Sequence, residues 1–375
     1  MKVEQLSLKD DSWSTDIDRI EIKPTLILLF VSLTFKSKTL LLTELNKRFP
    51  EACIIGCATA GEINGDYVND STVSLTAITF NKVTCKLASH NLSDFSESYD
   101  SGRALATQLE HKDLSHVLVF SHGVDVNGSE IVAGLKSELP NTSITGGLAG
   151  YNVETKDSFV IANTSMASKQ IVGVGLYGDA LNVGYGSNGG WNSFGIDRLV
   201  TKSNKNVVYE LDGTPALAIY KSFLGEDRYN IPDVGLSFPF SMRVNEYDST
   251  VVRTVRRVIE EDQSLVFAAN VPKGSTLRLM KSNVDRLING AGDSAIKAIS
   301  QTKHKPKLAI LVSCIGRRLL LKQLVEEEVE AVGEVLGDDV KVTGFYSFGE
   351  IAPADQYSRC ELHNQTMTIT TLSEC

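Results

Sequence analysis

The sequence is poor in cysteine and histidine, the residues that most often build disulfide frameworks and transition-metal sites. Six cysteines are scattered along 375 residues, and no two of them form a Cys-x-x-Cys pair. Neither a disulfide framework nor a zinc ribbon is therefore indicated. We expect free thiols in a reducing compartment.

Long hydrophobic runs are also missing. The longest, residues 26–31, is far shorter than the ~20 apolar residues that cross a bilayer. The first residues, MKVEQLSLKDDSWSTD, are polar and acidic and lack the apolar core of a signal peptide. These features predict a soluble protein of the cytoplasm.

Positive charge is in deficit. Lys and Arg number 37 against 46 Asp and Glu, which gives a net charge of −9. Phosphate-rich partners need a basic face, so this balance argues against nucleic acid and anionic membranes as partners. Apolar residues make up 42% and charged residues 22%, as in ordinary globular proteins. At ~150 residues per domain, the length predicts two domains.

One strand-helix-strand pattern occurs three times. A short apolar strand precedes a helix with apolar residues at steps of three and four, then a second strand that runs into glycines, then a closing strand. The first strands lie at 26–32, 117–120 and 308–312, the helix faces at 41–49, 131–139 and 321–336, and the closing strands at 72–80, 171–177 and 366–372. The β-α-β order favours parallel pairing, and the closing strands indicate antiparallel additions.

These repeats predict the fold class. We expect an α/β protein of repeated β-α-β units with mixed sheets, arranged as two domains with internal duplication. Composition shifts toward strands after a helix expected at residues 216–223, which places the boundary near residues 222–230. The predicted domains are 20–225 and 226–375.

A shared word, Gly-x4-Gly-Glu-Ile, follows the second strand of the first and third repeats. It contains Gly61 and Glu62 in the first copy and Gly349 and Glu350 in the third. Ligands bind at the carboxyl ends of strands in open α/β sheets, so the two acids are candidates for a shared ligand site. The alternative is a tight turn that the fold needs for packing alone. The glycine run of the second repeat adds Gly147 to the candidates.

Two expected helix starts carry polar residues that could bind an anion. Asn127 stands at the N-cap position, three residues before Glu130, which is the spacing of a capping box. It either caps the helix alone or leaves N–H groups for the anionic end of a ligand. Arg317 and Arg318 follow a strand and could bind a carboxylate or propionate, or simply be solvated.

The glycine-rich segment 184–190 matches neither a P-loop nor a dinucleotide-binding fingerprint. We interpret it as a bent loop that a ligand approaches. Trp191 beside it is either a lid over that ligand or part of the core.

Enzyme signatures are absent from the sequence. It has no Gly-x-Ser-x-Gly and no His-Glu-x-x-His, and no nucleophile-base pair can be argued from it. Two histidines stand at places of interest: His122 follows the first strand of the second repeat, and His363 precedes the last closing strand. A lone histidine is more often structural than a ligand.

Several of these segments together resemble one family. Residues 56–63, 183–191 and 209–217 resemble the N-terminal FIST domain, and residues 313–318, 344–351 and 362–367 resemble the FIST C-terminal domain. The resemblance covers about residues 25–372. It implies a sensory module that binds small ligands such as amino acids and acts on signal-transduction partners.

Stand-alone members of this length resemble the nitric-oxide-sensing haem proteins of bacteria, the NosP group. That resemblance implies haem b bound through a histidine and a histidine kinase or cyclic-di-GMP enzyme as partner. His363 is the first candidate iron ligand and His122 the second, with Arg317, Arg318 and Tyr346 as further haem contacts. His122 departs from the acidic residue that we associate with many relatives at its place.

The alternative is a haem-free receptor for an amino acid or another carboxylate. Asn127, Glu62 and Glu350 would then contact the charged ends of the ligand, near Gly61, Gly147, Trp191 and Gly349. We expect a sensor and not an enzyme in either case.

Overall fold

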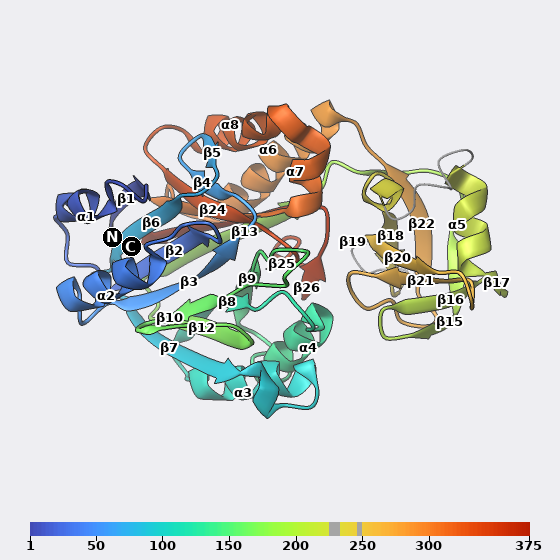
Figure 1. Cartoon of the computed structure of the whole chain (residues 1–375), viewed down its shortest axis with the longest axis horizontal. Coiled ribbons are helices and arrows are strands. Elements are labelled where there is room, and N and C mark those ends of the chain that lie inside the picture. The colour runs from blue at the N-terminus through green and yellow to red at the C-terminus, as the bar shows by residue number, and fades with distance from the viewer. Residues whose placement is uncertain (225–232, 246–249) are drawn as a thin grey trace.

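The computed structural model describes residues 1–224, 233–245 and 250–375. In these residues the chain folds into three six-stranded sheets and one nine-stranded sheet. The three six-stranded sheets make a large body with helices on its outside, and the nine-stranded sheet lies beside this body (Figure 1). The boundary predicted near residues 222–230 falls mostly outside the described residues, so the division at 225/226 stays a prediction.

The three large sheets share one order: outer strand, closing strand, central strand, second strand, hairpin. The first is β1 (Lys2–Leu8), β6 (Val73–Thr79), β2 (Leu26–Ser32), β3 (Cys53–Thr59), β10 (Val160–Ala162) and β11 (Ser165–Ala167). The second is β7 (Thr84–Asn91), β12 (Gln170–Tyr177), β8 (Leu114–Ser121), β9 (Ser143–Leu148), β25 (Glu350–Pro353) and β26 (Cys360–His363). The third is β13 (Leu181–Asn188), β27 (Met367–Glu374), β23 (Leu308–Cys314), β24 (Lys341–Ser347), β4 (Glu62–Asn64) and β5 (Tyr67–Asn69).

Strand directions confirm the predicted repeat. Each central strand pairs in parallel with the second strand of its own repeat: β2 with β3, β8 with β9, and β23 with β24. Each pairs antiparallel with its closing strand, β6, β12 or β27. The fold is therefore α/β with repeated β-α-β units and mixed sheets.

Backbone conformation marks the same point in all three repeats. The residue at the tight turn before each closing strand has a positive φ: 61° at Ser71, 49° at Lys169 and 57° at Gln365. L-residues adopt this conformation rarely, so three such residues at one place in the pattern support a common origin of the units.

The hairpins are exchanged between repeats in a cycle. β4 of the first repeat pairs with β24 of the third. β25 of the third pairs with β9 of the second, and β10 of the second pairs with β3 of the first. Every large sheet thus contains a hairpin that another repeat supplies.

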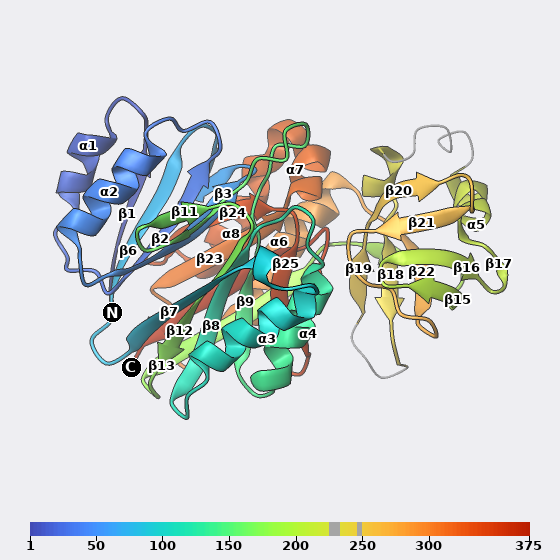
Figure 2. The same cartoon turned by 60° about the horizontal axis from the view of Figure 1, so that its bottom comes forward.

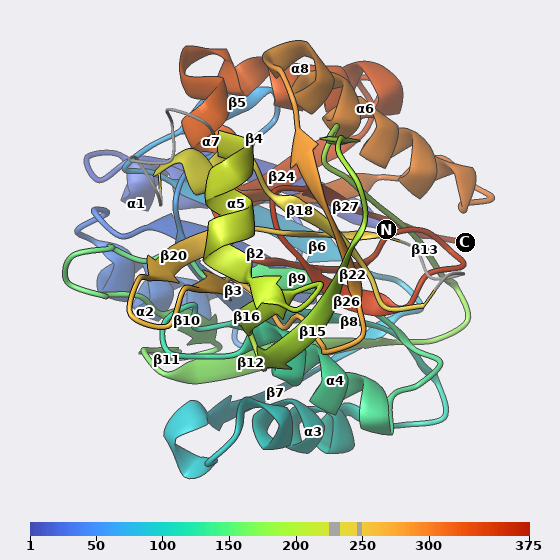
Figure 3. The same cartoon turned by 90° about the vertical axis from the view of Figure 1, so that its right-hand side faces the viewer.

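Helices cover the outer face of each large sheet, as Figures 2 and 3 show from two sides. The first sheet has α1 (Trp13–Asp16), the 3-10 helix η1 (Ile17–Arg19) and α2 (Lys38–Arg48); the second has η2 (Leu92–Asp94), α3 (Ser98–Leu109) and α4 (Gly128–Glu138). The third has α6 (Val284–Ser300), α7 (Ile315–Leu321), η5 (Lys322–Leu324) and α8 (Val325–Leu336). The single helix face predicted over 321–336 is interrupted after Leu321, because Lys322 has a φ of 54°.

The inner faces of the three sheets meet in a shared core. Three aromatic rings pack against one another there. The ring centroids of Phe30 and Phe120 are 5.5 Å apart, and Phe345 lies 4.8 Å from Phe30 and 5.7 Å from Phe120. Phe30, Phe120 and Phe345 are completely buried.

The nine-stranded sheet is inserted between β13 and α6. Its strands are β19 (Val251–Arg253), β18 (Phe240–Arg243), β22 (Thr276–Lys281), β15 (Arg198–Asn204), β16 (Val207–Leu211), β21 (Ser264–Phe267), β20 (Val255–Ile259), β14 (Asn192–Ser193) and β17 (Thr214–Pro215). α5 (Ala216–Leu224) packs on it, and η4 (Asp233–Leu236) lies beside β20. We call residues 192–281, as far as they are described, the inserted domain. Arg253 fastens it to the large body by donating to the Leu362 carbonyl at 2.8 Å.

Candidate functional site

Three equivalent residues end the central strands on the face that points to the shared core. In each repeat the backbone N–H of this residue donates to a carbonyl at the start of the closing strand: Ser32 to Thr72 at 3.0 Å, His122 to Gln170 at 2.9 Å, and Cys314 to Thr366 at 3.1 Å. Alternation along the strands places all six side chains on the core side, since their neighbours Val73, Ile171 and Met367 pack on the helix side. The carboxyl ends of parallel strands are the usual ligand site in α/β sheets.

In the first repeat, Glu62 closes this strand end. Its carboxylate accepts from the Thr59 hydroxyl, from the Thr72 N–H at 3.1 Å and from the Thr72 hydroxyl at 2.9 Å. Glu62 is buried, and desolvation raises its pKa to about 7 although the three hydrogen bonds act in the opposite direction. We call this arrangement of an acid, a loop hydroxyl and a threonine the acid clasp.

The third repeat has the same clasp. The Glu350 carboxylate accepts from the Ser347 hydroxyl at 2.9 Å and from the Thr366 N–H and hydroxyl at 3.2 and 3.0 Å. The Cys314 thiol hydrogen-bonds it as well. Desolvation raises the pKa of Glu350 to about 8. The partners of each acid come from its own repeat, so the clasps hold the turns at two of the three strand ends.

The second repeat lacks the clasp. The register of the strand pairs aligns Gly146 with Gly56 and Gly344 of the other repeats. In this alignment Ala149 takes the position of the hydroxyl residues Thr59 and Ser347. Asn152 takes the position of the acids Glu62 and Glu350. Ala149 has no hydroxyl to offer. Asn152 is exposed, and its Oδ1 accepts from the N–H groups of Glu154 and Thr155 instead.

Two polar atoms are buried and without a hydrogen-bond partner at this second-repeat strand end: His122 Nε2 and Gln170 Oε1. Nearly all buried polar atoms in folded proteins are hydrogen-bonded, so each of these two atoms can accept a further partner. The turn before Thr366 in the third repeat has two such atoms as well, Asn364 Oδ1 and Gln365 Oε1. Desolvation lowers the pKa of His122, because burial disfavours the charged imidazolium. Its Nδ1 lies 3.2 Å from the Val124 carbonyl oxygen and 3.4 Å from the Val124 nitrogen.

Tyr151 connects this strand end to the inserted domain. Its ring stacks on Phe348 with centroids 3.9 Å apart, and it lies beside Gly123, where an added Cβ would come within 3.4 Å of the tyrosine ring. The Tyr151 hydroxyl accepts from Arg256 Nη2 at 2.8 Å. The Tyr151 ring thus lies against Gly123, the residue after His122, and Arg256 of the inserted domain hydrogen-bonds its hydroxyl.

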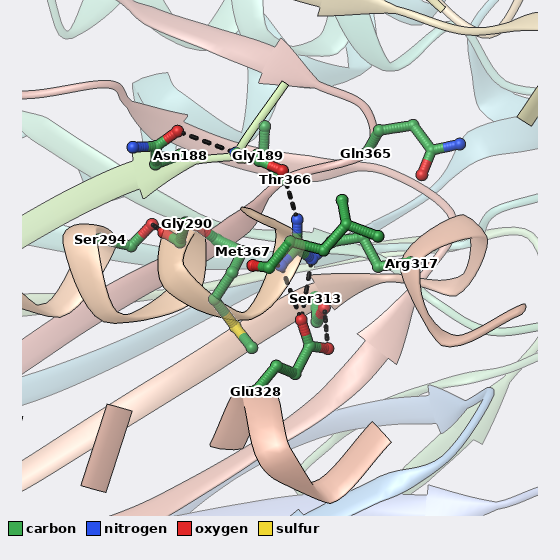
Figure 4. A network of polar contacts seen from close by, with 12 residues as sticks. Asn188, Gly189, Gly290, Ser294, Ser313, Arg317, Glu328, Gln365, Thr366 and Met367 are labelled. Atoms are coloured by element: carbon green, nitrogen blue, oxygen red, sulfur yellow. Dashed lines mark hydrogen bonds and ion pairs between the residues drawn. The ribbon is translucent and has the colours of Figure 1, made fainter. Parts of the chain in front are cut away.

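The candidate haem contacts apart from His122 are bound to protein groups. His363 is buried, and its Nε2 lies 2.8 Å from the Ala352 carbonyl; desolvation lowers its pKa to about 4. Arg317 forms a completely buried ion pair with Glu328 (Figure 4). The Tyr346 hydroxyl donates to the same glutamate at 2.6 Å. Arg318 is bound by Asp70 at 2.7 Å and lies over the Tyr346 ring.

The candidate ligand residues fall at four places. Gly147 and Gly349 touch across the β9–β25 pair, next to Glu350 and His363. Gly61, with a φ of 133°, and Glu62 stand at the equivalent point between the first and third repeats.

The remaining two candidates stand at contacts of their own. Asn127 caps α4, accepting from the Glu130 N–H at 3.3 Å, and its amide donates to Asn270 of the inserted domain. Trp191 donates to the Gln365 carbonyl at 2.8 Å. The structure thus brings together the residues of each clasp, whereas Asn127 and Trp191 lie at separate contacts.

Sequence reasoning missed Gln170 and the hydroxyl partners of the acids. A signal existed: once the three repeats are aligned at Gly56, Gly146 and Gly344, the second repeat is the one without Gly-Glu. Within the described residues, no three His, Cys, Asp or Glu side chains form a group that could hold a metal ion.

Comparison with known proteins agrees with this architecture. The FIST N domain matches residues 25–214, and the FIST C domain matches residues 216–353. The chain belongs to the FIST family. FIST domains are sensory modules.

Individual relatives of this FIST protein are distant. An uncharacterized protein of Methanocaldococcus jannaschii is 25% identical over 342 residues, which cover 84% of this chain and 65% of that protein. The chain thus spans just under two thirds of that relative's length. Among solved structures, cyanuric acid hydrolase of A. caulinodans matches with a TM-score of 0.37 at 8% identity, covering 99% of this chain and 98% of that one.

A chorismatase gives a TM-score of 0.35 at 9% identity, over the same shares of the two chains. At these scores neither likeness bears on the activity of this FIST protein. Within the part of the chain that the structure describes, no helix is long and apolar enough to span a bilayer.

Proposed function

We propose that this FIST protein is a cytoplasmic sensor of a small molecule, not an enzyme, and that its ligand binds at the second-repeat strand end. One observation carries the proposal: His122 Nε2 and Gln170 Oε1 are buried without a partner, whereas the equivalent places in the other repeats are closed by Glu62 and Glu350. Burying a polar group without a hydrogen bond costs about 1–3 kcal/mol, which a bound ligand would offset.

In its most specific form, the proposal is that the ligand is haem b and the signal nitric oxide. Haem iron held by one histidine keeps its opposite face available to a diatomic gas. His122 fits this role best. When its Nδ1–H donates to the Val124 carbonyl, Nε2 keeps the lone pair, and metal-bound histidines typically donate their other ring N–H in this way. His363 fits less well, since its Nε2 is bound to Ala352.

Absorption spectra test the haem form directly. Protein expressed with a haem precursor is expected to show a stoichiometric Soret band that moves on reduction with dithionite and again on addition of nitric oxide. His122→Ala should lose this band, and His363→Ala is the matched control that should keep it. A featureless spectrum, or a band unchanged in His122→Ala, would contradict haem binding at this place.

A haem-free receptor for a carboxylate is the second candidate. It is favoured by the equivalence of the repeats. In the first and third repeats a glutamate carboxylate binds the first residue of the closing strand, and in the second repeat a ligand carboxylate would take this place. A thermal-shift screen of amino acids and other carboxylates separates the two forms. Ligand at 100 times its Kd stabilises the protein by about 2.7 kcal/mol, and a flat screen would count against this form.

The signalling partner that we propose is a sensor histidine kinase or a cyclic-di-GMP cyclase or phosphodiesterase. The support is the family's sensory role. The rate of kinase autophosphorylation, measured with the ligand-loaded and the ligand-free protein, should differ. Equal rates for every kinase and cyclic-di-GMP enzyme encoded beside the gene would contradict the proposal.

A further inference from the structure

We propose that the second-repeat strand end binds the carboxylate of its ligand, in the place that the Glu62 and Glu350 carboxylates hold in the other two repeats. The inference rests on the proposed sensory function in its haem-free form and specifies the chemical class that the site selects. It follows from comparing the three strand ends residue by residue.

The first part of the argument is positional. In both complete clasps a carboxylate lies against the first residue of the closing strand, where it accepts the N–H and hydroxyl of Thr72 or Thr366. Gln170 has that place in the second repeat, opposite His122 across the same backbone hydrogen bond. The second repeat has no acid at the clasp position, because the loop after Ala149 turns outward and exposes Asn152. Asp125 and Lys169 are the charged groups near enough to act on His122, with opposite effects on its pKa.

The second part concerns hydrogen-bonding chemistry. The Gln170 amide presents either its oxygen or its NH2 group by a rotation about the last bond, and the two are interchangeable in shape. His122 presents an Nε2–H in the tautomer whose Nδ1 accepts from the Val124 N–H. A carboxylate would thus receive two donors in a buried place, where hydrogen bonds to a charged acceptor are the strong ones.

The third part is the way in. Tyr151 stands where the complete clasps have Gly61 and Gly349. Its side chain lies beside Gly123, next to His122, and its outer end is bound by Arg256 of the inserted domain. The body of a ligand whose carboxylate lies at His122 would contact this ring, so occupancy would be transmitted to the inserted domain.

The test uses the full chain labelled with 15N-histidine and three small probes: sodium acetate, acetamide and methylammonium chloride. The His122 resonances are assigned by their loss in His122→Gln. We expect millimolar acetate to shift them saturably, while acetamide and methylammonium leave them in place. A saturable shift with methylammonium alone would overturn the inference, because the site would then select a cation, and so would an absence of any shift.

Gln170→Glu tests whether the site prefers a negatively charged ligand. The substitution keeps the shape and adds a negative charge, so it should weaken the acetate response about tenfold or more. Gln108→Glu, with the same charge change on the exposed face of α3, should leave it unchanged. Tighter acetate binding in Gln170→Glu would overturn the inference.

A second variant supplies the missing clasp residues from the chain itself. Asn152→Glu combined with Ala149→Ser and Gln170→Thr copies the third repeat, and should abolish the acetate response while the melting temperature stays equal or rises. An acetate response that survives in this variant would overturn the inference. A Soret band without any acetate response would overturn it too, and would leave the proposed sensory function standing.

Discussion

Arg317 and Glu328 form an ion pair between two side chains that are both completely buried, with Nη2 and Oε2 2.7 Å apart (Figure 4). Arg317 Nε donates to the same carboxylate at 2.9 Å, and Nη1 and Nη2 donate to the carbonyls of Gly189 and Leu287 at 2.9 and 2.7 Å. Glu328 also accepts from Tyr346 at 2.6 Å. One pair therefore ties α7 and α8 to α6, to β24 and to the loop before the inserted domain.

Breaking this pair should be costly. Arg317→Met leaves the buried Glu328 carboxylate without its counter-charge, which typically costs about 3–5 kcal/mol of the free energy of unfolding. Urea denaturation measures the loss. Arg318→Met is the matched control: its ion pair with Asp70 is partly exposed and should cost about 1 kcal/mol or less. Equal losses for the two variants would contradict the role of the buried pair.

The buried acids predict how stability depends on pH. Glu350 has a folded-state pKa of about 8, above its unfolded value of about 4.3, so the folded state keeps a proton that the unfolded state releases. The stabilisation is fully present below the unfolded pKa and is lost as the pH rises to about 8. The contribution of Glu350 to the free energy of unfolding should thus fall between pH 5 and 8, by on the order of 1 kcal/mol per unit.

Glu350→Gln removes this titration and should flatten the profile measured by urea denaturation at several pH values. Relative to the wild type, the variant should gain stability on going from pH 5 to pH 8. Glu334→Gln, on the exposed side of α8, is the control and should keep the wild-type slope. A Glu350→Gln profile as steep as the wild type would rule out this acid as the cause.

The three-ring centre makes the shared core sensitive to truncation. Phe120→Ala removes a completely buried ring that contacts two others, Phe30 and Phe345, and should cost about 3–5 kcal/mol. Tyr357→Ala, at a side chain that is 89% exposed, should change the free energy of unfolding by less than about 0.5 kcal/mol. A small loss for Phe120→Ala would mean that the three sheets do not depend on this contact.

We expect Arg256 to transmit ligand binding at His122 to the inserted domain without contributing to the affinity for the ligand. Arg256→Ala removes a hydrogen bond to Tyr151 between partly exposed groups, so the unfolding free energy should fall by only about 0.5–1.5 kcal/mol. We expect acetate binding at His122 to persist while ligand-dependent hydrogen exchange in β20 disappears. Exchange in β20 that still responds to the ligand would exclude this route.

Much of the fold could be predicted from the sequence, because hydrophobic periodicity is local information. The strand predicted over residues 26–32 is β2, and the repeated parallel and antiparallel pairings are as expected. The break after Leu321 was not predicted, since steps of three and four continue through it. It comes from the backbone at Lys322, which lets Glu328 reach Arg317.

The candidate site was predicted only in part. A word shared by two repeats pointed to Glu62 and Glu350, but not to the partners that bind them, since Thr72 and Thr366 are brought close only by strand pairing. The exchange of hairpins between the repeats could not be predicted from the sequence either. Nothing in the residues around β4 indicates that its partner is β24, near the other end of the chain.

That exchange has a consequence for synthesis. On the ribosome, β4 and β3 emerge early, whereas the β24 strand that β4 pairs with is made near the end. The edges of β4 and of the second repeat's β9 must therefore wait unpaired through most of translation, and unpaired edges invite association with other chains. The order of elongation thus predicts that nascent chains stalled before β24 need chaperones, although the finished protein does not.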